Sequence, residues 1–510
     1  MVRIPKPVEI GVLVAALAVL LLGAVMSQFW TIIIKQRFYE KMSLKPGSRS
    51  YERWKVTPFP LYMKLYFWNW TNARESYYTR QIPEFSEVGP YVFRENHEKV
   101  NLTWNNNGTV SYRVIKRWYF EPEMTNGSLS DLITSVNVVA ASAAYMAKDA
   151  NRFFLIPISM MLRTTGQEIW WTKNVSELLF EGFVNPLQTL GVYVKGQNTP
   201  DRFGFFYKKN GTVSSQLLNM GTGTESFEDI GQLKYVDYRN STDLYPDCRR
   251  ISGSTGEFWP PDNDKLRPLV MYSPDMCRKL RFYFEEESAY NGLRSFAYAG
   301  TPASVDNGSS VPENKCYCNE RFCPPSGVFD LTKCAEGAPI YISYPHFYNA
   351  DPSYRQAVRG MSPDPEKHKY FVRIEPETGV QLEVAARTQV NVYLSRNSGL
   401  SLFRNVTDVF VPVFWMDTHV SLTEEYTSGL SLMKKMLLYG PFVFYGFVVA
   451  GLIAITVVVL LHFTGVTSMS CVKKNLKRNK PEGSKEENVL YSFRDIDKEE
   501  VKYVLPEDRL

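Results

Sequence analysis

Two long apolar segments interrupt an otherwise mixed pattern of hydrophobic and polar positions, one near each end of the chain. They cover residues 10–34 and 439–463, and as helices both are long enough to cross a hydrocarbon core of about 30 Å. The first has no polar side chain from Ile10 to Met26 and then continues through Phe29 and Trp30. This exceeds the roughly 7 to 15 apolar residues of a signal-peptide core. We therefore expect an uncleaved signal anchor and a second transmembrane helix, with a cleaved signal peptide as the alternative for the first.

Charge places the middle of the chain outside the cytosol. Basic residues flank the first segment on both sides, but a basic cluster at 473–480 follows the second, as expected on a cytoplasmic face, although Lys434 and Lys435 precede it. Two crossings put both termini on one side. We expect cytoplasmic tails at 1–9 and 464–510 and an exterior domain at 35–438. The plasma membrane is the first choice, and an endosomal or lysosomal membrane is the alternative.

N-glycosylation sequons support this topology independently. Asn-X-Ser/Thr triplets without proline occur only in the exterior domain, at Asn69, Asn101, Asn107, Asn126, Asn174, Asn210, Asn240, Asn307 and Asn405. The net charge of +5 and the 22% of charged residues are ordinary, so no nucleic-acid partner is expected.

Cysteine usage also indicates an oxidising compartment. Of the seven cysteines, all but Cys471 lie close together in the exterior domain, at Cys248, Cys277, Cys316, Cys318, Cys323 and Cys334. An even number there predicts disulfides, although six cysteines allow roughly 15 connectivities. A zinc site is the alternative, but no histidine stands nearby, so we expect no metal. Cys471, beside the second apolar segment, is a candidate for palmitoylation or remains a reduced thiol.

Alternating hydrophobicity predicts a mostly antiparallel sheet in the exterior domain. From Val380 to Leu394 the even positions are mainly apolar and the odd positions mainly polar, which predicts a strand with one buried face. Residues 370–374 share this parity, and the turn chemistry at 376–379 predicts a hairpin. Residues 110–114 have the pattern of another half-buried strand.

Helical patterns are concentrated in the first half of this domain. We expect a helix capped by Ser128 or Ser130 that runs through 133–146, a second at 148–163, and a short capped helix at 176–183. The predicted fold class is therefore α+β: a membrane glycoprotein with one large antiparallel exterior domain, a helical cluster and two transmembrane helices.

Several motifs, in this order, resemble those of the class B scavenger receptor family. They are Gly89-Pro90-Tyr91-Val92-Phe93, the segment 253–262 with Phe258-Trp259-Pro260-Pro261, the segment 333–343 before Pro345-His346-Phe347, Ile374-Glu375-Pro376 with Thr378-Gly379, and Gln389-Val390-Asn391. The similarity covers essentially the whole chain, including both anchors, and we expect an insect-type member.

The resemblance implies a β-barrel-like ectodomain with an apical helical bundle and a hydrophobic tunnel from the apex toward the membrane. It also implies the disulfide pairs Cys248–Cys316, Cys277–Cys334 and Cys318–Cys323. Family members receive ligand at the apex, which corresponds to positions 148–171 here. The residues expected at the mouth are Lys148, Arg152, Phe153, Phe154, Met160, Met161 and Arg163. This basic patch is smaller than in the lipoprotein-binding members.

The predicted function is a cell-surface receptor that binds hydrophobic ligands, such as fatty acids, sterols, carotenoids or lipoprotein lipids, and passes them to the membrane. A sixteen-carbon chain gains about 12 kcal/mol when it leaves water for an apolar conduit. Aromatic and methionine side chains adapt well to flexible ligands, and Lys148 or Arg152 is suited to meet a carboxylate. The alternative for the apolar residues is that they pack the core of the helical bundle.

Other classes of protein fit the sequence less well. An adhesive or phagocytic receptor that does not conduct lipid shares the same anchors and glycans. A two-span ligand-gated channel needs a polar pore lining, whereas the second span is nearly all apolar. The sequence contains no nucleophile elbow, zinc-protease motif, phosphate loop or dinucleotide motif, so we expect neither an enzyme nor a cofactor. The expected partners are lipid-like ligands or lipid-bearing particles, and homo-oligomerisation is left open.

Overall fold

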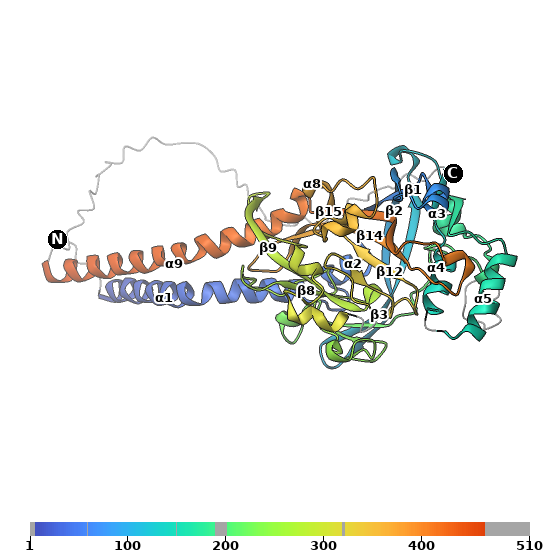
Figure 1. The fold of residues 1–510 in the computed structure, drawn as a ribbon. Coiled ribbons are helices and arrows are strands. Elements are labelled where there is room, and N and C mark those ends of the chain that lie inside the picture. The colour runs from blue at the N-terminus through green and yellow to red at the C-terminus, as the bar shows by residue number, and fades with distance from the viewer. Residues whose placement is uncertain (1–5, 59, 149, 189–200, 319–321, 465–510) are drawn as a thin grey trace, which may run out of the picture. The chain divides into compact units, whose positions relative to one another are not determined.

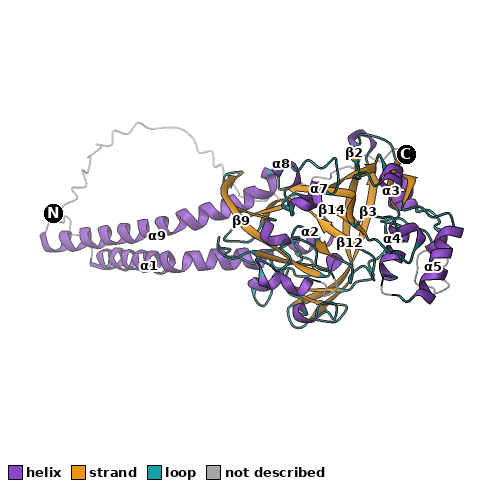
Figure 2. Cartoon of the chain, viewed as in Figure 1, coloured by secondary structure: helices purple, strands orange, loops and turns teal. Residues whose placement is uncertain are grey.

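A computed structural model describes residues 6–58, 60–148, 150–188, 201–318 and 322–464 of the chain (Figure 1). The polypeptide divides into two compact units, one formed by Met1–Leu21 with Phe447–Leu510 and the other by Leu22–Gly446. Among the described residues, the second unit contains every strand (Figure 2). It is therefore the unit that positions the candidate site.

A 13-stranded antiparallel sheet forms the body of the second unit. Its main path follows the order β7-β6-β3-β2-β1-β15-β14-β13-β10-β9-β8, and β12 pairs with both β11 and β14. A separate two-stranded sheet joins β4 to β5. The strands are β1 (Leu61–Trp70), β2 (Phe85–Asn105), β3 (Thr109–Phe120), β4 (Leu132–Val136), β5 (Trp170–Asn174), β6 (Leu218–Gly221), β7 (Leu233–Val236), β8 (Leu269–Ser273), β9 (Arg278–Tyr290), β10 (Leu293–Ala299), β11 (Phe329–Asp330), β12 (Ile340–Ser343), β13 (Phe371–Ile374), β14 (Gln381–Leu394) and β15 (Val409–Ser421).

The two ends of this strand order are joined through Ser254. This residue forms an antiparallel bridge with Gln232, next to β7, and a parallel bridge with Met271 of β8. The neighbouring Gly253 has a φ of +127°, and a Cβ atom there would lie 3.0 Å from the Val270 carbonyl oxygen, so the close approach needs glycine. The sheet thereby curls back on itself, and the predicted β-barrel-like ectodomain is confirmed.

Helices lie at both ends of this body. The helices are α1 (Lys6–Met42), α2 (Arg49–Lys55), α3 (Ala73–Thr79), α4 (Val138–Met146), α5 (Arg152–Thr164), α7 (Pro352–Gln356), α8 (Pro365–His368) and α9 (Glu424–Thr464). Within the second unit, α4 and α5 lie together at one end of the sheet, and the last turns of α1 and the first turns of α9 join it at the other (Figure 1). We call the α4–α5 end the apex.

Helices α1 and α9 contain the two apolar segments, and both are long and apolar enough to cross a membrane. Small residues allow them to approach each other closely. In the second unit a Cβ atom at Gly440 would fall 1.7 Å from Nε1 of Trp30, and in the first unit a Cβ at Gly451 would fall 2.8 Å from Cβ of Leu20. Two of the glycines that interrupt the second apolar segment are therefore helix-packing positions.

The first predicted helix is wrong over its first half. Residues 132–136 form β4, which pairs with β5, because isoleucine, threonine and valine suit an extended strand better than a helix. Helix α4 starts only after Asn137, whose side-chain oxygen accepts a 3.0 Å hydrogen bond from the Ala140 N–H, so asparagine and not serine is the cap. The second predicted helix begins later than expected, at Arg152. The short third helix is a π-helix at Glu177–Glu181, and Ser176 does not cap it through its side chain.

Strand β14 confirms the predicted long strand, and its pairing with β13 confirms the hairpin. The expectation of a single buried face is wrong for its second half, because every residue from 389 to 394 is buried. Strand β12 pairs along this half, and the apical helix α4 packs beside it, with the rings of Tyr145 and Tyr393 centred 6.4 Å apart. Residues of both parities, Val392 and Tyr393 among them, belong to the main core, so both faces are covered there. The predicted strand at 110–114 lies within β3.

Candidate functional site

Helix α5 at the apex carries an exposed apolar stripe. Phe153 is 85% exposed, Ile156 65% and Met160 66%, and their spacing of three and four residues puts them on one side of the helix. Leu155 and Leu162 are 9% and 1% exposed and anchor the opposite side in the main core. Helix α5 is thus apolar on two sides, one facing the body and one facing outward.

The predicted mouth residues divide accordingly. Phe153 and Met160 lie on the outward stripe, whereas Met161 is partly buried against the main core. The alternative that these residues pack the bundle therefore applies to Met161 but not to Phe153 or Met160. The side chains of Arg152 and Phe154 lie outside the described part of the structure.

Of the basic residues predicted at the mouth, Lys148 and Arg163 have described side chains, and they stand at opposite ends of α5. Lys148 precedes α5 and donates a 3.0 Å hydrogen bond from Nζ to Oγ of Ser395, after the end of β14. Arg163 is exposed in the last turn of α5. Sequence reasoning missed Ile156, the central residue of the outward stripe. Its spacing from Phe153 and Met160 was the available signal, but the many other apolar residues of this helix concealed it.

Three disulfide bonds join the exterior cysteines: Cys248–Cys316, Cys277–Cys334 and Cys318–Cys323. These are the pairs that the family resemblance implies. The first two connect segments separated by 68 and 57 residues and so restrict the unfolded chain strongly. Cys471 lies outside the described residues, so its lipidation stays a prediction.

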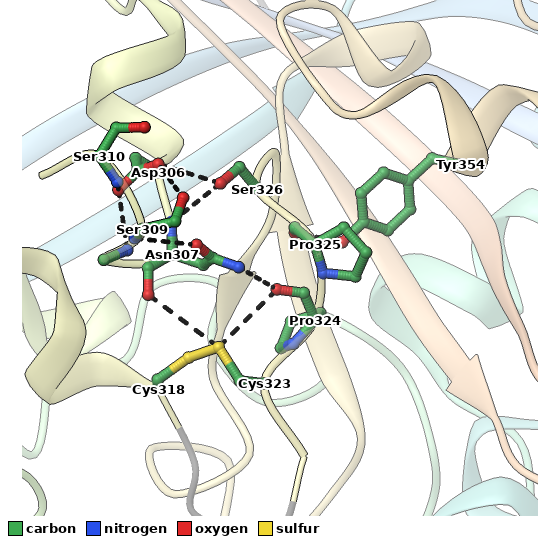
Figure 3. The surroundings of a disulfide bond; sticks show 11 residues. Asp306, Asn307, Ser309, Ser310, Cys318, Cys323, Pro324, Pro325, Ser326 and Tyr354 are labelled. Atoms are coloured by element: carbon green, nitrogen blue, oxygen red, sulfur yellow. Dashed lines mark hydrogen bonds between the residues drawn. A yellow bond between two sulfur atoms is a disulfide. The ribbon is translucent and has the colours of Figure 1, made fainter.

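A hydrogen-bonded turn at residues 306–311 lies beside the Cys318–Cys323 bond (Figure 3). The carboxylate of Asp306 accepts hydrogen bonds from the N–H groups of Gly308 and Val311 at 2.8 and 2.9 Å, and from the Ser326 hydroxyl at 3.1 Å. Although burial works in the opposite direction, the backbone bonds from Val311 and Gly308 hold the pKa of Asp306 below its ordinary value. The turn thus presents the sequon residue Asn307, whose Nδ2 donates to the Pro324 carbonyl oxygen at 2.9 Å.

The nine sequon asparagines differ in exposure. The asparagines at 101, 107, 126, 210, 240 and 405 are exposed, and those at 69, 174 and 307 are partly buried. Asn107 and Asn240 both line a groove of about 1230 Å³. Glycans at these two positions would occupy that groove, so we do not consider it a site for hydrophobic ligands.

The side chains of two histidines are buried together beside strands β1, β2 and β15. The rings of His346 and His368 stack with their centres 4.0 Å apart. Nε2 of His346 lies 2.9 Å from Oε2 of Glu87, and its Nδ1 accepts the Ser362 N–H at 3.0 Å. Nδ1 of His368 likewise accepts the Asp364 N–H at 2.8 Å. Each Nδ1 therefore accepts a backbone hydrogen bond, and His346 is a packed, hydrogen-bonded residue of the fold.

This environment makes the fold sensitive to acid. Burial, followed by the neighbouring His346, lowers the pKa of His368 from 6.5 to about 4. An unfolded chain therefore binds a proton between pH 6.5 and 4 that the folded chain does not, and stability falls as the pH falls through that window. We expect the midpoint of thermal unfolding to drop by a few degrees more in wild type than in His368→Gln between about pH 7 and about pH 4.5. A His419→Gln control, at a more exposed ring, should behave like wild type; an unchanged pH profile in His368→Gln would contradict this account.

A cavity of about 180 Å³ opens beside the last residue of α1. Its apolar lining consists of Met42, Phe227, Ile230, Phe258, Trp259, Val380, Leu382, Val420 and Leu422. Its acidic lining residues, Glu257 and Glu383, already pair with Lys99 at 2.5 Å and Arg373 at 3.1 Å. None of the lining residues is basic. We call this the membrane-side cavity; it is large enough for a ring-sized group, because engineered apolar cavities of about 150 Å³ hold benzene.

An ion pair ties α9 to the body near this cavity. Nζ of Lys434 lies 3.0 Å from Oε1 of Glu375 and 2.6 Å from Oε2 of Glu377, and the side chain of Glu375 is fully buried. The second oxygen of Glu375 accepts the N–H and the hydroxyl of Thr378. Lys434 is a basic residue on the side of the second apolar segment where the predicted topology expects few. Its role here is to pair with a buried carboxylate. The Glu-Pro-X-Thr-Gly motif has a structural role in this docking.

Two terminal apolar helices joined to a disulfide-bonded, barrel-like exterior body with a helical apex define a membrane receptor. The model of the CD36 family matches residues 11–462. Protein peste of Drosophila melanogaster is 35% identical over 442 residues, which cover 85% of this chain and 79% of that protein. Scavenger receptor class B member 1 of Bos taurus is 30% identical over 85% of each chain, and lysosome membrane protein 2 of Rattus norvegicus is 32% identical over 78% of this chain and 82% of that protein. The chain belongs to the CD36 family, the class B scavenger receptors, as its motifs indicated.

Proposed function

We propose that this receptor binds hydrophobic ligands at the exposed stripe of α5 and passes them through the interior of the barrel-like body to the membrane. The observation that carries the proposal is the stripe itself: three large apolar side chains, each at least 65% exposed, at the apex. Contiguous exposed apolar surface is typical of ligand or partner sites. Phenylalanine and methionine also adapt to ligands of varied shape.

The membrane-side cavity supports the second half of the proposal. It lies at the other end of the body from α5, beside the helix that carries the first apolar segment, and its lining is mainly apolar. A sixteen-carbon chain gains about 12 kcal/mol in such surroundings, so a sheltered route removes the main barrier to transfer through water. The interior between the two ends is the proposed route.

The lining of the membrane-side cavity bears on the choice of cargo. A free carboxylate there would lie near Glu257 and Glu383 with no basic lining residue to pair it, and an unpaired buried charge is costly. The cargo best suited to this cavity is uncharged at the end that enters it: a sterol, a carotenoid, or the hydrocarbon tail of a fatty acid.

A substitution that fills the cavity tests conduction. Val420→Trp should reduce the delivery of a fluorescent sterol to the bilayer by about fivefold, because the larger side chain occupies the lining, while binding at the apex continues. Val420→Ala enlarges the cavity and is the matched control. The readout is sterol appearing in the membrane of cells that express equal surface amounts of each variant. Equal delivery by Val420→Trp and wild type would contradict transfer through this cavity.

An adhesive or phagocytic receptor is the second candidate function, because the same exposed stripe can grip a protein or particle. Binding at the cell surface with no delivery of lipid into the bilayer, in wild type, would favour it. For location we propose the plasma membrane with both termini cytoplasmic; an endosomal or lysosomal membrane is the alternative.

A further inference from the structure

The loop at residues 260–268 lies beside the point where the first apolar segment ends. Nζ of Lys35, the residue that follows Ile34, is 3.6 Å from Oδ1 of Asp262 in this loop. The loop is also tied to the start of α9: the Asp262 N–H donates to the Glu377 carbonyl oxygen at 3.2 Å, and the carboxylate of Glu377 pairs with Lys434. Both helices thus hold the loop at the level where they leave the apolar core of a membrane.

The loop is fixed in one conformation. Oδ1 of Asp264 accepts the N–H groups of Leu266 and Arg267 at 2.8 and 2.9 Å, and these bonds lower the pKa of its carboxyl group. The Tyr298 hydroxyl donates to the Asp264 carbonyl oxygen at 2.8 Å, and the Asn263 N–H donates to the Pro376 carbonyl oxygen at 2.8 Å. The direction of the residues at its tip is therefore set before any partner arrives.

That tip presents an apolar side chain flanked by two basic ones. Leu266 is 94% exposed, the highest fraction among the large apolar side chains in the described ranges. Lys265 precedes it and pairs with Glu287 at 2.7 Å. Arg267 follows it, and although its Nε lies 3.0 Å from Oδ2 of Asp264, its side chain is 87% exposed. A single exposed leucine is common on an ordinary protein surface. Here, however, it stands on a fixed loop at most about 14 Å of chain from the ion pair with Lys35.

We propose that the 260–268 loop is a membrane contact of the exterior domain, with Leu266 inserted into the outer leaflet of the bilayer that holds α1 and α9. Arg267 reaches the lipid phosphate groups, as basic residues at the interface do, while the leucine occupies the boundary with the acyl chains. The same segment of chain supplies Phe258 and Trp259 to the membrane-side cavity. Insertion of Leu266 therefore holds the mouth of that cavity against the lipid, but the contact itself does not depend on lipid transfer.

The depth of residue 266 in a bilayer tests this proposal. The full-length glycoprotein carrying Leu266→Cys, in a Cys471→Ser background, is labelled with an environment-sensitive fluorophore and placed in phosphatidylcholine nanodiscs. Lipids with a nitroxide near the top of the acyl chain should quench the label at least twofold. A Phe153→Cys variant, equally exposed but at the apex, is the matched control and should not be quenched.

An unquenched label at position 266, with a folded and glycosylated protein, would overturn the proposal. If the new cysteine disturbs the disulfides, Leu266→Trp read with brominated lipids, after subtraction of wild-type emission, answers the same question. If Leu266 inserts, the fluorescence that the introduced tryptophan adds is quenched in brominated lipid. If that added fluorescence is the same in brominated and ordinary lipid, insertion is refuted. Neither measurement involves lipid uptake, so failure of the proposed function would not alter the result.

Discussion

Replacing both Phe153 and Met160 with aspartate will reduce the uptake of hydrophobic ligands at least tenfold while the receptor still reaches the cell surface. Both side chains are mostly exposed, so the charges cost the fold little, but they put two carboxylates where an apolar ligand has to leave water. A loss of about 1.4 kcal/mol in binding already corresponds to a factor of ten. The measurement is uptake of a labelled sterol and a labelled fatty acid, normalised to surface receptor.

The matched control for this experiment is Tyr238→Asp, which changes a side chain that is 83% exposed outside the apex. It should leave uptake unchanged. A second variant, Leu162→Asp, places the charge on the buried side of α5 and should instead prevent the receptor from reaching the surface. Normal uptake by the Phe153 and Met160 double variant, at normal surface levels, would remove the outward stripe from the ligand site.

Lys434→Met should destabilise the exterior domain by about 3 to 5 kcal/mol, because it leaves the carboxylate of Glu375 buried without its cationic partner. A loss of this size is a large share of the stability of a typical domain. We therefore expect most of the protein to be retained inside the cell. Surface labelling and the thermal unfolding of detergent-purified protein both report this effect.

The neighbouring Lys435 provides a close control. It carries the same charge one residue further along α9 but is exposed, so Lys435→Met should leave surface levels near wild type. The double variant Lys434→Met with Glu375→Gln removes both charges and should recover part of the lost stability. If Lys434→Met and Lys435→Met behave alike, the lysine acts through general charge near the membrane and not through the pair with Glu375.

Local sequence patterns were sufficient to predict an element where one kind of interaction dominates. The two apolar segments form long helices because uninterrupted hydrophobicity over that length has few other outcomes. The period-two pattern predicted β14 as a long strand, although not which of its residues are buried, and the ordered motifs identified the family. At residues 132–136 the same reasoning failed, since an apolar, alanine-rich stretch nearby suggested helix while pairing with β5 decided for strand. Neither strand of that pair reveals its partner, which lies some forty residues away in sequence.

In the candidate site, too, some features follow from the local sequence and others only from tertiary contacts. Sequence and resemblance placed the candidate mouth on α5 and included Phe153 and Met160, but they could not separate these exposed residues from Met161, which packs against the core. The sequence of a helix that is apolar on two sides does not indicate which side packs against the sheet body. The contacts of Lys434 and the exposure of Leu266 also depend on the tertiary structure, because the sequence shows only a lysine near an apolar segment and a leucine without a local pattern.

The amino-acid sequence by itself determined the two long apolar helices, the antiparallel character of the body and the family, because each depends on composition, periodicity or ordered motifs along the chain. Only the tertiary structure decided which apolar side chains of α5 face outward, that Ser254 closes the sheet, and that Glu375, the cavity and the 260–268 loop each lie beside α1 or α9. Those features arise from contacts between segments far apart in the chain, and the free energy of such contacts is set by burial and charge pairing that no local pattern records.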